Sequence, residues 1–233
     1  ASLAEAASRA RVTLAGGETA SLPGIVKELD LSGTALGWLP RDAAITGEGI
    51  CAGDKLIGLP SSGFHSNGYS LVRSVIERTG ADLRAVAPFE VEESRIERFA
   101  EGPVTLGEVL LNPTRIYVDP VYDLIAAARS GEGPCSAAEL RGIAHITGGG
   151  LSNLLRLHDS LGYHISDPLP ILPEFDWVAR EGGVDVREMA RTFNLGMGMV
   201  VVVSPQCADS VVSWLNERLG GCGVVGEVRE HGR

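Results

Sequence analysis

The densest group of polar side chains lies in residues 61–69 (SSGFHSNGY), after a short apolar run. A loop of this kind ahead of a helix collects backbone amides and the positive helix end, which suits a phosphate or a developing negative charge. His65 adds a group that exchanges a proton near neutral pH. The segment therefore predicts a functional site, and the alternative is a capped helix with a solvent-facing His65. The candidate residues are Ser62, Gly63, His65, Ser66 and Asn67.

A run of three glycines, Gly148, Gly149 and Gly150, stands between a predicted buried strand and a predicted helix. Glycines at such a junction permit close approach of the backbone to a ligand. The run has neither the spacing of a dinucleotide-binding loop nor the lysine of a P-loop. The neighbouring His145 and Thr147 are further candidates, and His145 is equally consistent with a hydrogen-bonded strand residue.

A second glycine pair lies in residues 14–20 (LAGGETA), where Gly16 and Gly17 follow a short apolar segment. Their amides could approach an oxyanion, and the carboxylate of Glu18 is a ligand of the type that Mg²⁺ takes. The alternative is a plain turn with an exposed Glu18. Thr19 completes this candidate group.

Two smaller motifs complete the set. In residues 112–115 (NPTR), Arg115 could reach a phosphate or a carboxylate, while Thr114 could instead cap the helix that follows. In residues 191–199 (RTFNLGMGM), Asn194 could bind a ligand or serve a turn.

Composition narrows the function classes. The chain has 233 residues, 44% of them hydrophobic, and a net charge of −10, which argues against nucleic acid because phosphate backbones require clustered Lys and Arg. No apolar run approaches the roughly 18–20 residues needed to cross a bilayer. The four cysteines form no CxxC pair, and the motifs of zinc proteases and serine hydrolases are absent from the sequence. Reduced thiols in a cytoplasmic protein are the simple interpretation, and the charge does not exclude a phosphorylated small-molecule ligand.

The candidate residues must be positioned by alternating strands and helices. We expect helices at residues 67–78, 117–128, 151–157, 173–180, 186–191 and 206–219, and strands at 11–15, 31–39, 55–59, 143–146, 163–166, 197–203 and 224–228. Ser66 or Asn67 should cap the first helix and Gly80 should end it. This alternation predicts an α/β (α+β) fold with a mixed sheet covered by helices, and a domain boundary near residues 47–53.

The motifs taken together resemble one family. GGETA, SSGFHSNGYSLVR, PTRIYV, HITGGG and RTFNLGMGM stand in the order found in phosphoribosylformylglycinamidine cyclo-ligases, the aminoimidazole ribonucleotide synthetases. The similarity covers nearly the whole chain. The family's N-terminal domain begins roughly a hundred residues earlier and carries an acidic nucleotide motif that this sequence lacks.

The resemblance implies that residues 1–50 are the end of an N-terminal ATP-binding and dimerisation domain and that residues 51–233 are the C-terminal domain. It implies a cytoplasmic homodimer that uses ATP and Mg²⁺ to close formylglycinamidine ribonucleotide to aminoimidazole ribonucleotide in purine biosynthesis. It assigns nucleotide or phosphate binding to Gly16, Gly17, Glu18, Thr19, Gly148, Gly149 and Gly150, with Glu18 also on the metal. It assigns catalysis to His65 and Asn67, and substrate binding to Ser62, Gly63, Ser66, Thr114, Arg115, His145, Thr147 and Asn194.

Two other interpretations stay open at this point. One is another ATP-using member of the same superfamily, of the formylglycinamidine ribonucleotide synthetase, selenophosphate synthetase or thiamine-monophosphate kinase type. The other is a module that only binds ligand or dimerises. Because the chain lacks an initiating Met and the upstream acidic motif, we expect it to be a fragment of a longer protein and inactive alone.

Overall fold

The computed structural model describes residues 2–26 and 29–230, and the chain divides into two compact units, Ala1–Ala44 and Ile45–Arg233. The described part of the first unit holds helix α1 (Ser2–Arg9) and a 3-10 turn, η1 (Arg41–Ala43), with no strand. The strands predicted at residues 11–15 and 31–39 are therefore wrong. A strand needs a partner for its backbone N–H and C=O groups, and the described residues of this unit supply none.

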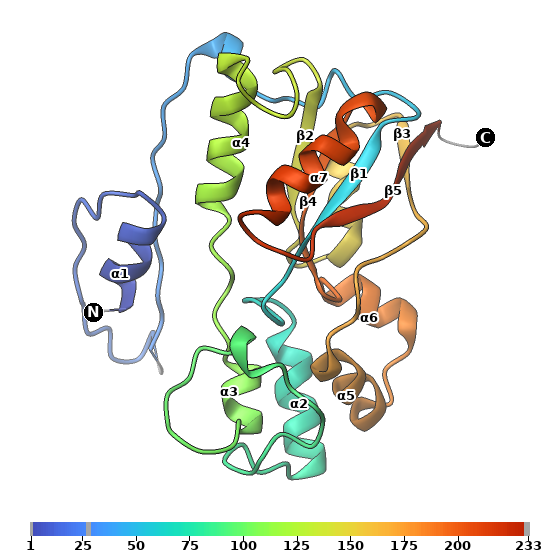
Figure 1. Cartoon of the computed structure of the whole chain (residues 1–233). Helices are drawn as coiled ribbons and strands as arrows, with labels where there is room; N and C mark the ends of the chain where they lie inside the picture. Colours follow the sequence, from blue (N-terminus) through green and yellow to red (C-terminus); the bar gives the residue numbers. More distant parts are fainter. Residues whose placement is uncertain (1, 27–28, 231–233) are drawn as a thin grey trace. The chain divides into compact units, whose positions relative to one another are not determined.

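The second unit is built on one sheet, whose described strands follow the order β2-β4-β1-β5-β3 (Figure 1). The strands are β1 (Lys55–Pro60), β2 (Leu140–His145), β3 (Leu161–Ile165), β4 (Met197–Val203) and β5 (Gly223–Glu230). The α/β class is confirmed, but the sheet is antiparallel in each pairing rather than mixed. β4 and β5 run in the same direction, with α7 between them in the chain. However, β1 from far upstream lies between them and pairs antiparallel with both.

Helices cover both faces of the sheet because its strands alternate apolar side chains between the two sides. Ile57 and Val201 point to the face covered by α4 (Val118–Ser130) and α7 (Ala208–Asn216). Leu56 and Val200 point to the opposite face, against the 3-10 helix η3 (Gly150–Arg156). The helix expected at residues 151–157 is thus a 3-10 helix.

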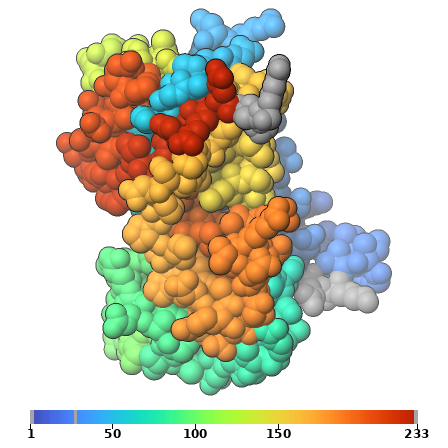
Figure 2. Space-filling model, turned by 90° about the vertical axis from the view of Figure 1, so that its right-hand side faces the viewer, coloured from blue at the N-terminus to red at the C-terminus, as the bar shows by residue number. Residues whose placement is uncertain are grey.

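A further core lies among α2 (Tyr69–Thr79), α3 (Leu106–Leu110), α5 (Pro173–Gly182) and α6 (Val186–Thr192). Phe64, Phe175 and Phe193 meet at its centre, with ring centroids 4.6–5.7 Å apart. Figure 2 shows α5 and α6 (orange) below β5 (dark red) on one face of this unit. Phe64 lies inside the candidate loop, so this core anchors the loop that carries His65.

Most predicted helices are confirmed within a few residues, including the left-handed Gly80 that ends α2. The predicted cap of α2 is wrong: Gly68, at φ +74°, holds the N-cap position, and an added Cβ there would collide with the ring of Phe193. The predicted cap at Thr114 is also wrong, because α4 begins after Tyr117. No helix among the described residues is both long and apolar enough to cross a membrane.

Candidate functional site

The candidate loop leaves the end of β1 and turns sharply back on itself. Ser61 N–H donates to the Gly196 carbonyl at 2.8 Å, which ties the loop to the start of β4. Gly63 adopts φ +149° and His65 adopts φ +59°, a left-handed backbone that is uncommon for a residue with a side chain. Such conformations persist only where surrounding structure determines them, and they cluster at functional sites. The turn buries His65, which is 3% exposed.

The hydrogen bonds of His65 define its tautomer. Ring nitrogen Nε2 accepts the N–H of Ser62 at 3.2 Å, so the proton of the neutral ring lies on Nδ1. Burial, followed by the charges of His145 and Arg115, lowers the pKa of His65 to about 4. The ring is therefore neutral near pH 7 and offers an Nδ1–H donor. Within residues 2–26 and 29–230 this buried Nδ1 has no hydrogen-bond partner.

The ring of His65 lies close to two other aromatic rings, those of His145 and Tyr117. The centroids of His65, His145 and Tyr117 lie 5.9–6.1 Å apart in pairs, so the end of β2 and the start of α4 meet the candidate loop here. Tyr117 donates its hydroxyl to the Pro60 carbonyl at 2.8 Å, and burial raises the pKa of that hydroxyl. The rings of His65 and Tyr117 lie directly over Gly198 of β4, where an added Cβ would sit 2.5 Å from Cε1 of His65.

The glycine run joins the candidate loop through a single side chain. The Oδ1 atom of Asn67 accepts the N–H of Gly148 at 2.8 Å, and Gly150 N–H donates to the Thr147 carbonyl at 2.9 Å. Thr147 is itself held by Asn153, whose Oδ1 accepts its N–H at 2.8 Å. Two of the three glycine amides expected to face a phosphate are thus engaged within the protein.

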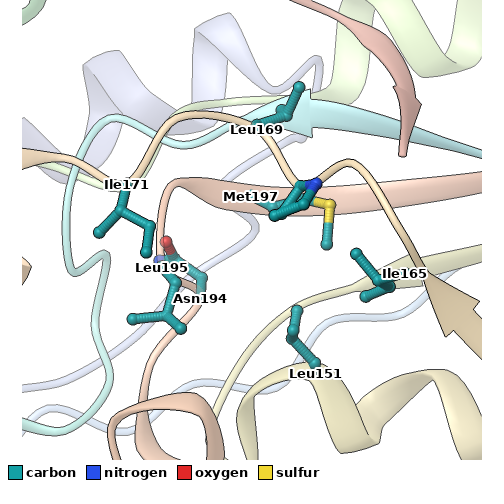
Figure 3. A pocket seen from close by; sticks show the side chains of 8 residues that line it. Leu151, Ile165, Leu169, Ile171, Asn194, Leu195 and Met197 are labelled. Carbon is teal, nitrogen blue, oxygen red and sulfur yellow. The ribbon is translucent and has the colours of Figure 1, made fainter. Parts of the chain in front are cut away.

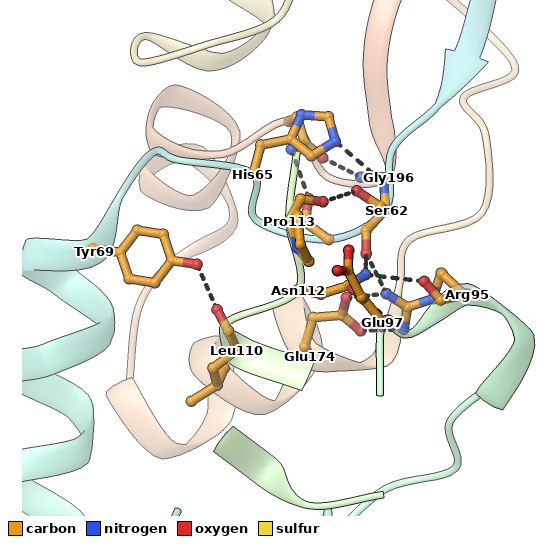
Figure 4. Close-up of polar contacts among 12 residues, drawn as sticks. Ser62, His65, Tyr69, Arg95, Glu97, Leu110, Asn112, Pro113, Glu174 and Gly196 are labelled. Atoms are coloured by element: carbon orange, nitrogen blue, oxygen red, sulfur yellow. Dashed lines mark hydrogen bonds and ion pairs between the residues drawn. The ribbon is translucent and has the colours of Figure 1, made fainter. Parts of the chain in front are cut away.

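A buried polar cluster holds Ser62 from behind (Figure 4). The Ser62 carbonyl accepts from Nη1 of Arg95 at 2.8 Å and from Nδ2 of Asn112 at 2.5 Å. Arg95 forms a two-pronged ion pair with Glu174, at 2.7 and 3.0 Å. Our sequence analysis missed Arg95 and Glu174. Nothing in the local pattern marks them, since they are 79 residues apart and each stands among other charged residues.

The remaining candidates are of two kinds: side chains whose hydrogen bonds hold the loop, and a side chain whose charge is available to a ligand. Asn194 is engaged internally: it donates to the Gly63 carbonyl and accepts from Gly196 N–H, both at 2.9 Å. Ser66 and Thr114 pair through their hydroxyls at 3.2 Å. Arg115 is half-buried and, in the described part of the chain, has neither a hydrogen bond nor an ion pair. Its charge is available to an anionic ligand.

The Asn194 side chain also lines a cavity of about 250 Å³ whose other walls are apolar (Figure 3). The walls include Leu151, Ile165, Leu169 and Met197. Each polar atom of Asn194 already forms one hydrogen bond within the protein.

The candidate residues of the first unit lie on the exposed surface of that unit. Gly16, Gly17, Glu18 and Thr19 are exposed, and a Cβ added at either glycine would meet no atom within 4 Å. Among the described residues, no three His, Cys, Asp or Glu side chains gather closely enough to hold a metal ion. Mg²⁺ is usually bound through one or two carboxylates together with substrate phosphates and water, so the assignment of Glu18 to the metal stays a prediction.

The antiparallel sheet with helices on both faces makes the second unit an α/β domain, and its candidate residues lie mainly in two polar loops that Asn67 joins. The family model described as AIR synthase related protein, C-terminal domain, matches residues 52–233, and the chain belongs to this family.

Particular relatives are similar along the chain. A phosphoribosylformylglycinamidine cyclo-ligase of Methanothermobacter thermautotrophicus is 43% identical over 230 residues, covering 99% of this chain and 61% of that protein. A chloroplastic/mitochondrial protein of the same name from Vigna unguiculata is 44% identical over 204 residues, covering 85% of this chain and 47% of that protein. The chain thus spans about 61% of the length of the first of these relatives.

Among solved structures, the hydrogenase maturation protein HypE in complex with ATP matches with a TM-score of 0.47 and 17% identity, over 83% of this chain and 48% of that one. A likeness at this level carries no functional argument.

Proposed function

We propose that this chain forms part of an ATP-dependent cyclo-ligase that converts formylglycinamidine ribonucleotide to aminoimidazole ribonucleotide, ADP and phosphate. The order of its motifs and its similarity to relatives of that name support the proposal. In the structure, the observation that carries it is the buried, neutral His65, whose Nδ1–H donor has no partner among the described residues.

The reaction asks three things of the protein. ATP phosphorylates the formyl amide oxygen, the amidine nitrogen then attacks the formyl carbon, and phosphate leaves with the electrons of the C–O bond. The protein must hold the two reacting ends together, bind the phosphate charge and direct hydrogen-bond donors at the reacting oxygen.

We propose that Nδ1–H of His65 donates to the substrate oxygen that receives the phosphoryl group. A neutral donor draws less electron density from that oxygen than a cation would, and it stabilises the negative charge that the oxygen gains as phosphate leaves. Because Nε2 accepts from Ser62 N–H, that nitrogen is not available as a base. We propose that Arg115 and His145 contact the anionic parts of the substrate, and that Asn67 and the glycine run form the adjacent wall.

The wider assembly is part of the same proposal. We propose that residues 1–50 complete an N-terminal domain that binds ATP, with Gly16, Gly17, Glu18 and Thr19 near the nucleotide, and that residues 51–233 form the second domain. With ATP bound, the carboxylate of Glu18 would be one oxygen ligand of a Mg²⁺ ion, and the ion would supply positive charge at the phosphates. We propose a cytoplasmic homodimer, which the solution mass of the longer protein and cell fractionation would test.

The central experiment measures substrate-dependent ADP release by the longer protein with ATP and Mg²⁺ present. His65→Ala should lower kcat about 10²–10³-fold, the usual effect of removing a preorganised donor. The matched control is His164→Ala, an exposed histidine on β3, which should leave kcat within twofold. ADP release that does not depend on formylglycinamidine ribonucleotide would refute the activity. Equal kinetics for the two variants would refute the role of His65.

A further inference from the structure

The hydrogen bonds around Ser62 connect a buried ion pair to the tautomer of His65. We infer that Arg95 and Asn112 are positioning residues: they hold Ser62 so that its N–H faces Nε2 of His65 and the ring proton stays on Nδ1. The inference rests on the proposed function only for its effect on turnover, since the tautomer itself is a property of the folded chain.

Ser62 is fixed at three points besides its bond to His65. Its carbonyl accepts from Arg95 and Asn112, and its own hydroxyl donates to the Pro113 carbonyl at 2.6 Å. The residue is 7% exposed, so water does not replace these bonds easily. Few conformations of Ser62 satisfy all of them, and the one present directs its N–H at the ring.

This restraint matters because the hydrogen bond from Ser62 N–H to His65 is long, so a small displacement would break it. The N···N distance from Ser62 to Nε2 is 3.2 Å, at the long end of the usual range, and such bonds weaken steeply as distance and angle worsen. His65 also sits in a left-handed backbone, three residues after the donor. A shift of Ser62 by about an ångström would break the bond and make both neutral tautomers available.

The position of Arg95 is set in turn by Glu174, in the first turn of α5. The Glu174 side chain is fully buried and that of Arg95 is 7% exposed. The planar guanidinium meets both carboxylate oxygens and still directs Nη1 at Ser62, a geometry that a lysine ammonium does not reproduce.

Asn112 links the same elements a second time. Its Nδ2 atom bonds the Arg95 carbonyl at 3.1 Å as well as that of Ser62, and its Oδ1 atom accepts Glu97 N–H at 2.9 Å. The two side chains that hold Ser62 are therefore also tied to each other.

The test is ¹⁵N NMR of the histidine ring nitrogens in the whole 233-residue chain, at neutral pH. The wild type should show a protonated Nδ1 and an unprotonated Nε2 for His65. Arg95→Lys keeps the positive charge beside Glu174 but loses the planar guanidinium that bonds both the Glu174 carboxylate and the Ser62 carbonyl. Asn112→Ala removes the second donor to the Ser62 carbonyl. Each should shift the two ring signals toward a mixture of tautomers.

Arg98→Lys is the matched control, because Arg98 pairs with Glu108 at 3.2 Å in the same region, and none of its hydrogen bonds within the described part of the chain goes to Ser62. It should leave the His65 ring signals unchanged. Methyl spectra establish that each variant is folded. Wild-type signals in a folded Arg95→Lys or Asn112→Ala chain would overturn the inference. A protonated Nε2 in the wild type would overturn it without any variant.

Kinetics of the longer protein separate this inference from the proposed function. Arg95→Lys should lower kcat at least tenfold, with the KM for ATP within twofold, and Arg98→Lys should change neither. If the ring signals shift and kcat does not, positioning stands and the catalytic role of His65 fails. If the ring signals do not shift, positioning fails whatever the kinetics.

Discussion

Gly198 on β4 is the position where one added methyl group should disturb the site most. In Gly198→Ala the new Cβ would overlap the hydroxyl of Tyr117 and lie 2.5 Å from Cε1 of His65. Neither ring can withdraw easily, because Tyr117 is bonded to the Pro60 carbonyl and His65 to Ser62 N–H. The substitution should therefore displace buried rings that are held by hydrogen bonds.

The expected cost follows from three contributions. Overpacking of a buried site costs about 1–3 kcal/mol. Loss of the Tyr117 hydrogen bond adds about 1 kcal/mol. Restriction of the unfolded chain by alanine returns about 0.4–1 kcal/mol. The net loss in unfolding free energy should be about 1–3.6 kcal/mol, which corresponds to a fall in Tm of about 2–14 °C for a domain of this size.

Urea unfolding of the whole chain, followed by circular dichroism, measures this difference. Gly223→Ala is the matched control on β5, where the new Cβ would lie 3.8 Å from Leu169, an ordinary contact, and stability should stay the same or rise slightly. A second test adds Tyr117→Phe, which removes the hydroxyl that Cβ would overlap. Its cost should be smaller in Gly198→Ala than in the wild type. Equal unfolding midpoints for the two alanine variants would refute this account of the packing.

Three further results are expected from the same structure. The pKa of His65 is about 4 in the folded chain and about 6.5 in the unfolded chain. Between these values the unfolded state binds more protons, so the unfolding free energy should rise with pH, by roughly 2–3 kcal/mol from pH 4.5 to 7.5. In urea titrations, His65→Gln should lose this part of the pH dependence. Glu174→Gln, which breaks a buried ion pair, should lower the unfolding free energy by about 3–5 kcal/mol. Glu227→Gln, in a pair about one-third exposed, should lower it by no more than about 1 kcal/mol in the same assay. Equal losses for the two variants would contradict the burial described. Asp185→Ala should cost about 1 kcal/mol, since Asp185 caps α6 through the N–H groups of Arg187 and Glu188; an unchanged melting curve would count against the cap.

Local patterns predicted the second unit well. An unbroken apolar run located β4 at residues 197–203, and Gly80 located the end of α2, because both features act over a few residues. The polar density of residues 61–69 marked His65 as a candidate, which stays a prediction, but it did not indicate that the ring is buried and neutral. Burial of His65 depends on Tyr117 and Gly198, which no spacing rule connects to it.

Long-range pairing explains what the sequence could not predict. The strands expected in the first unit have no partner among its described residues. The insertion of β1 between β4 and β5 makes the sheet antiparallel. The ion pair of Arg95 and Glu174 joins segments whose local sequence is unremarkable in charge. In each case the deciding contact lies far along the chain.

The place of β1 at the centre of the sheet also bears on how the protein folds as it is made. The cross-strand partners Lys55 and Glu227 are separated by 172 residues, so β1 leaves the ribosome long before β5. At ordinary synthesis rates this delay is on the order of ten seconds or more. For most of that time neither β4 nor β5 has been made, so Leu56, Ile57 and Leu59, fully buried in the finished sheet, lack much of the structure that buries them. We therefore expect slow folding from these long-range pairings and a nascent chain that exposes apolar surface until the last strands are made.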